Sequence, residues 1–178
     1  MRIVGAASLV VLMATPMAQA APKGLYGKSV TVTWNETRSQ RDGQSGPFRS
    51  VSIPYLTTYY VSGEGHVFTR TTAKGATGAG FGSADRVGAT GSDGTGNARN
   101  VAFSGNKIVA NTAFGGAGRH VEVTFDGSFA SCSAQVITAM PKGAKTAVVR
   151  SVSTGGNVEF ESVSAGPANC SIASGNPF

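Results

Sequence analysis

Two histidines are the residues best suited to acid–base chemistry in this chain of 178 residues. His66 follows the turn-forming sequence Gly63-Glu64-Gly65, and His120 stands two residues before Glu122. Residues two apart on a strand share a face, so each histidine could pair with a carboxylate or contribute to a metal site. Solvated strand ends explain the same residues without any chemistry. A hydrolase that uses His66 or His120 as acid or base is therefore the alternative hypothesis.

Other catalytic patterns lack the residues that their chemistry needs. The segment 115–121 approaches the calcium-binding pattern Gly-Gly-x-Gly-x-Asp-x, but His120 stands where the aspartate ligand belongs, and the pattern occurs once. No Gly-x-Ser-x-Gly turn is present to expose a nucleophilic serine. We therefore predict no catalytic residue, no metal and no cofactor.

Tyrosine and arginine side chains offer the chemistry of a binding surface. Tyr55, Tyr59 and Tyr60 lie within one segment, which Arg49 precedes and Arg70 follows. Tyr59 and Tyr60 must point to opposite faces of a strand, so at least one should meet solvent. An exposed tyrosine near arginine can stack on a sugar or pack on a protein partner. These five residues are the predicted ligand site, with core packing as the alternative role for the tyrosines.

The only two cysteines are predicted to form a disulfide. Cys132 and Cys170 lack the Cys-x-x-Cys spacing and the neighbouring histidines of a zinc site. In an oxidising compartment they should pair, which stabilises the fold by roughly 3 to 4 kcal/mol in the chain-entropy model.

The first twenty residues have the features of an export signal. Arg2 precedes an apolar stretch from Ile3 to Met13, and Ala18-Gln19-Ala20 supplies the small residues of a cleavage site. The apolar stretch is about half of the roughly 20 residues that span a membrane, so no transmembrane span is expected. We predict that residues 1–20 are cleaved and that 21–178 form a single domain in the periplasm or outside the cell.

Charge is spread along the chain without a run of one sign. Lysine and arginine number 15 against 9 acidic residues, for a net charge of +6. A protein that binds nucleic acid concentrates its basic residues on one element to neutralise phosphates. Nucleic acid is therefore not an expected partner.

Apolar residues recur at every second position, as in strands with one buried face. The pattern is clearest over Val30–Trp34 and recurs over Val51–Tyr55 and Val121–Phe125. Turn sequences such as Asp126-Gly127 separate the segments and favour antiparallel hairpins. The sequence predicts a compact antiparallel β-sandwich, or a small closed β-barrel, of about eight to ten short strands with one disulfide.

Two segments interrupt this alternation. Residues 35–50 are polar and 75–97 contain eight glycines, and both are predicted to be long loops. At Asp126-Gly127 a two-residue hairpin loop would place Cys132 opposite Val121, on the inward face.

These expectations favour a non-enzymatic binding or structural module of the cell envelope or extracellular space. Its ligand would be a small apolar molecule, a glycan or an envelope protein. A histidine within hydrogen-bond reach of a carboxylate inside a pocket would instead favour the hydrolase.

Overall fold

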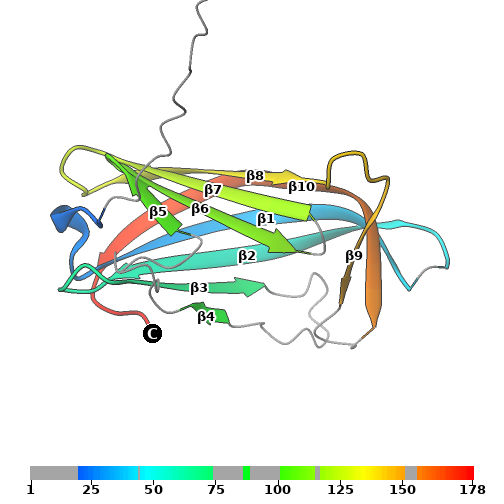
Figure 1. Ribbon diagram of the computed structural model, residues 1–178, viewed down its shortest axis with the longest axis horizontal. Helices are drawn as coiled ribbons and strands as arrows, with labels where there is room; N and C mark the ends of the chain where they lie inside the picture. Colours follow the sequence, from blue (N-terminus) through cyan, green and yellow to red (C-terminus); the bar gives the residue numbers. More distant parts are fainter. Residues whose placement is uncertain (1–19, 44, 74–85, 89–100, 115–116, 151–155) are drawn as a thin grey trace, which may run out of the picture.

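A computed structural model describes residues 20–43, 45–73, 86–88, 101–114, 117–150 and 156–178 (Figure 1). In these residues a short 3-10 helix, Lys23–Leu25, precedes ten strands. The strands are β1 (Lys28–Asp42), β2 (Arg49–Val61), β3 (Val67–Ala73), β4 (Arg86–Gly88), β5 (Val101–Ser104), β6 (Lys107–Phe114), β7 (Ala117–Phe125), β8 (Cys132–Ala139), β9 (Ala147–Arg150) and β10 (Asn157–Ser174). No helix in these described ranges is long and apolar enough to cross a membrane.

The strands form two antiparallel sheets. The larger sheet has the order β4-β3-β2-β1-β10-β9, and the smaller has the order β5-β6-β7-β8. The larger sheet curves like half of a barrel, and the smaller sheet lies against its inner side (Figure 1). The prediction of an all-β antiparallel domain with one disulfide is thus confirmed. Of the two predicted architectures, a sandwich and a closed barrel, the structure has the one with two sheets.

The alternating pattern of β1 continues well beyond its apolar residues. Val30, Val32 and Trp34 point inward, and the next inward positions are taken by polar residues that are equally buried. The prediction of a loop over 35–50 is therefore wrong, because residues 35–42 extend β1 and residues 49–50 begin β2. The hydrophobic pattern ends there, but backbone pairing on both sides keeps the strand extended. The predicted loop over 75–97 lies outside the described residues, apart from β4.

Strand β10 is longer than its apolar pattern predicts and bends as it crosses the larger sheet (Figure 1). Its pairing with β1 shifts register twice, between Trp34 and Glu36 and between Ser39 and Gln40. The first shift places Gly166 and Pro167 in a β-bulge, where a proline is tolerated because its missing N–H would have no ladder partner. The bulge locally re-aims the side chains of the outer face.

The predicted disulfide is confirmed. Cys132 on β8 is bonded to Cys170 on β10, with the two Cα atoms 5.7 Å apart. The bond joins the two sheets and packs against the buried apolar residues. It therefore adds a covalent connection between β8 of the smaller sheet and β10 of the larger sheet.

The predicted register of the β7–β8 hairpin is wrong. Val121 lies opposite Val136, and Cys132 lies opposite Phe125. The loop is longer because the Asp126 carboxylate accepts hydrogen bonds from the backbone N–H groups at 130 and 131, at 2.8 and 3.3 Å. The register differs from the prediction by four residues, an even number, so Cys132 still points inward.

The space between the sheets has two differently filled parts. The part nearer the β2–β3 and β7–β8 turns, called the apolar half, is filled by fully buried side chains, among them Val30, Val32, Val61, Val67, Ile108 and Val123. The part nearer the β1–β2 turn, called the charged half, contains buried Glu36, Arg38, Gln40 and Arg119.

Candidate functional site

The three predicted tyrosines point to different sides of β2. Tyr59 lies inward and is 2% exposed, and its burial in the apolar half raises the pKa of its hydroxyl well above the ordinary value. Tyr55 also points inward and stacks on Trp34, with ring centroids 5.3 Å apart. Tyr60 points outward beside Phe68 of β3.

The two predicted arginines are far from each other. Arg49 is exposed and forms an ion pair with Asp42 at the β1–β2 turn. Arg70 lies on the outer face of β3, with its guanidinium 4.9 Å from the ring centroid of Phe178. The structure thus brings Tyr60 and Arg70 to one outer face and does not gather the five residues into one site.

Neither histidine has a carboxylate partner among the described contacts. His66 is exposed after the β2–β3 turn, where the Ser62 hydroxyl donates instead to Glu64. His120 lies on the outer face of the smaller sheet, with its Nδ1 2.8 Å from the amide oxygen of Asn111. The described residues also contain no group of three metal-ligating side chains. The hydrolase hypothesis gains no support from this geometry.

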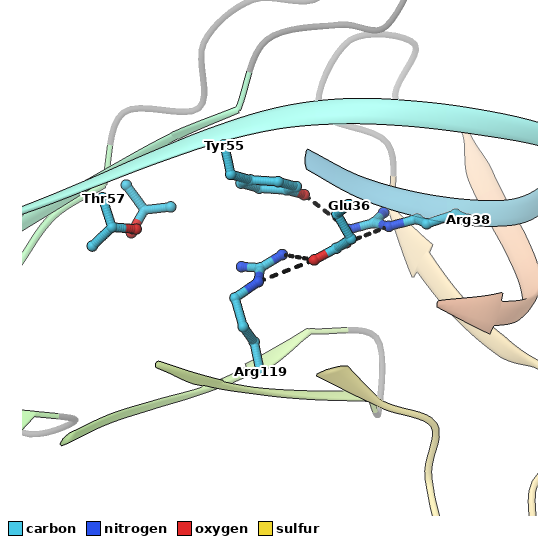
Figure 2. A network of polar contacts seen from close by, with 6 residues as sticks. Glu36, Arg38, Tyr55, Thr57 and Arg119 are labelled. Carbon is cyan, nitrogen blue, oxygen red and sulfur yellow. Dashed lines mark hydrogen bonds and ion pairs between the residues drawn. The ribbon is translucent and has the colours of Figure 1, made fainter. Parts of the chain in front are cut away.

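The charged half contains an ion-pair network that joins the sheets (Figure 2). Glu36 of β1 has no exposed surface, and one carboxylate oxygen accepts hydrogen bonds from Nε and Nη2 of Arg119 at 3.1 and 2.6 Å. The other oxygen accepts from Nε of Arg38 at 2.7 Å. Arg119 comes from β7 of the smaller sheet, so Glu36 is held from both sheets at once.

Aromatic rings complete the surroundings of this network. The Arg119 guanidinium lies 4.2 Å from the ring centroid of Tyr55 and 5.3 Å from that of Trp34, within cation–π range. Arg38 donates to the Tyr55 hydroxyl at 2.9 Å and lies over Phe160. These side chains are packed between the sheets, so the network's evident role is to fix how the sheets dock. In the sequence, the only sign of this network is that every second residue of β1 after Trp34 is a polar residue with a long side chain, from Glu36 to Gln40.

A hollow of about 360 Å³ lies on the outer face of the larger sheet, at the first bulge of β10. We call it the bulge groove. Trp34 and Tyr55 border it but point their side chains inward. Its outward-facing residues are Thr33, Asn35, Pro54, Leu56, Pro167 and Asn169.

The groove combines apolar surface with amide groups. Two prolines and Leu56, which is 39% exposed, supply the apolar surface. Asn35 and Asn169 each offer a donor and an acceptor, and Thr33 adds a hydroxyl. None of the lining residues is charged. This chemistry suits a neutral ligand that has both C–H faces and hydroxyl groups.

Known proteins give no parallel. No family model matches the chain, and no similar protein was found among curated proteins or among solved structures.

The sequence alone does not reveal the groove, because the residues that line it come from three strands. They become neighbours only through the pairing of β1 with β2 and with β10. The Gly166-Pro167 dipeptide was the available local signal, since glycine and proline within a strand often mark a bulge.

Proposed function

We propose that the protein is an exported, non-enzymatic binding module of the cell envelope or extracellular space, and that it holds a neutral glycan in the bulge groove. The observation that carries the proposal is the uncharged lining of that groove, with apolar and amide groups side by side. Sugars present C–H patches next to hydroxyl groups, which these two kinds of surface complement.

Two features support export. Residues 1–20 follow the pattern of a cleaved signal. The Cys132–Cys170 disulfide is compatible with an oxidising compartment.

The geometry favours a glycan over the other two ligand classes. A small apolar molecule needs an enclosed apolar space, but the apolar half is filled by its own side chains, such as Val32 and Val123 with no exposed surface. A protein partner usually anchors on large side chains such as arginine or exposed aromatic residues. The groove has no arginine, and Trp34 and Tyr55 at its border point inward.

The test is calorimetric titration of residues 21–178 with cellohexaose, laminarihexaose, mannohexaose and chitohexaose. Asn35→Ala and Leu56→Ala should each weaken binding of the preferred sugar about tenfold, because each removes one contact worth about 1.4 kcal/mol. Ile137→Ala is the matched control, since Ile137 is 49% exposed on the outer face of the smaller sheet. Binding of none of the four sugars, or equal losses in all three variants, would refute the proposal.

A further inference from the structure

The bulge groove continues into rows of hydroxyl groups on one side. Along the strands toward the β1–β2 turn, Ser52, Thr37 and Ser164 lie next to one another on β2, β1 and β10. All three point outward and are exposed. The next row in the same direction is formed by Ser50, Ser39 and Ser162. We call these two rows together the hydroxyl track.

The opposite side of the groove is different. There Thr58 and Thr31 bond to each other through their hydroxyl oxygens at 3.3 Å, and Thr58 is 5% exposed. Their hydroxyls are therefore less available to a ligand. Ser171 of β10 lies in the same row and is exposed, so this side keeps one open hydroxyl. The larger open hydrogen-bonding surface lies toward the β1–β2 turn, where a whole row of hydroxyl groups is exposed.

The track is uncharged up to a defined end. Its second row meets Glu161, whose carboxylate accepts a hydrogen bond from Ser39 at 2.8 Å. Beyond it Arg41 pairs with Glu159. The outer face of the smaller sheet differs, because a Lys107–Glu122 ion pair lies at its middle strands. The middle of the smaller sheet's outer face thus carries charge, whereas the hydroxyl track carries none.

The length of the groove and track together exceeds one sugar ring. From Thr33 to Ser39 the strand advances about 20 Å, at about 3.3 Å per residue. Small hydroxyl side chains offer hydrogen bonds without apolar anchors, which suits neither a protein interface nor a phosphate backbone. A neutral polymer with hydroxyl groups at regular intervals has the matching chemistry.

We infer that the ligand is an extended neutral polysaccharide, which lies along β1 from the bulge groove over the hydroxyl track. The inference rests on the proposed function and adds the substrate class and the direction of the chain. The first two sugar units occupy the groove against Leu56 and Asn35, and the following units hydrogen-bond to Thr37 and Ser164. Each further unit adds contacts, so affinity rises with chain length until the track ends at Glu161.

The experiment compares the disaccharide and the hexasaccharide of the preferred sugar by calorimetric titration. The wild-type chain should bind the hexasaccharide at least tenfold more tightly. Thr37→Lys blocks the track and should remove that gain while leaving disaccharide affinity unchanged. Gln135→Lys, which adds the same charge at an exposed position on β8, should change neither value. If Thr37→Lys lowers the melting temperature, Ser164→Lys replaces it as the blocking variant.

The outcomes separate the two proposals. Equal affinity for both chain lengths, or a gain that survives both blocking variants, overturns the hydroxyl track and leaves the groove as the site. No binding of either sugar overturns the proposed function itself.

Discussion

The two halves of the interior hold the same pair of sheets together by different means. In the apolar half Val32 and Val123 are buried by close packing, which has no preferred direction. In the charged half Glu36 is bonded to Arg119 across the sheets at fixed geometry. Packing favours contact between the sheets, whereas the ion pair favours one particular alignment. The difference suggests that the apolar half supplies most of the stability and the charged half the specificity of docking.

The largest effect is expected from removing the carboxylate charge. Glu36→Gln leaves two buried guanidinium groups facing a neutral amide, so the free energy of unfolding should fall by about 3–5 kcal/mol. Val32→Ala, on the same face of the same strand, should cost about 2 kcal/mol. Urea unfolding followed by fluorescence of Trp34, the only tryptophan, measures both. A smaller loss for Glu36→Gln than for Val32→Ala would contradict the contrast between the halves.

The next effect concerns the disulfide beside the apolar half. Replacing Cys132 and Cys170 by serine should lower the free energy of unfolding by roughly 3–4 kcal/mol, since the bond closes a segment with a sequence separation of 38. Guanidinium titration with and without a reducing agent measures this. The reductant should have no effect on the double variant, and a loss there would point to another cause.

A third change tests whether the network needs its geometry or only its charge. Arg119→Lys keeps the positive charge but loses the two-point contact with Glu36, so stability should fall by about 2 kcal/mol. Thermal unfolding detects the loss. Unchanged stability in the lysine variant would mean that a point charge is sufficient, and that the network does not fix the alignment of the sheets.

The smallest effects concern the loss of stability in acid, to which one carboxyl group beside each half of the interior should contribute. Hydrogen bonds from the Ser128 hydroxyl and the Ala130 N–H lower the pKa of Asp126, and the Arg41 side chain lowers the pKa of Glu159. A lowered pKa in the folded state means that the stabilisation is present above the ordinary values of 3.8 and 4.5 and is lost as the pH falls. Asp126 is exposed and Glu159 is partly buried, so solvent screens the effect more strongly at Asp126.

Melting temperatures measured from pH 6 to pH 2 test this prediction. Asp126→Asn, beside the apolar half, and Glu159→Gln, beside the charged half, should each make the decline in acid shallower than in the wild-type chain. A decline in either variant as steep as in the wild type would contradict the role assigned to that carboxyl.

The fold could be predicted largely because its local signals agree with its tertiary structure. Alternating residues such as Val30, Val32 and Trp34 mark a strand by themselves, and two cysteines allow only one pairing. The extension of β1 was missed because burial there depends on Arg119, which is 83 residues from Glu36 in the sequence. A buried charge is recognisable only when its partner is known.

The candidate site was harder to predict for a related reason. Asn35 and Asn169 become neighbours through a register that contains a bulge, and no local pattern records a register between distant strands. The tyrosines were conspicuous by type, but Tyr59 is in the core. Residue type suggested binding chemistry, whereas strand pairing decided which groups share a surface.

The position of β10 makes the larger sheet depend on a pairing between segments that are distant in the sequence. Lys28, at the start of β1, pairs with Ser174, at the end of β10. Pairing between such distant segments is slow to form. Until β10 docks, β1 has one unpaired edge, which another strand could occupy. A variant truncated before β10 would keep that exposed edge and lack a central strand of the larger sheet.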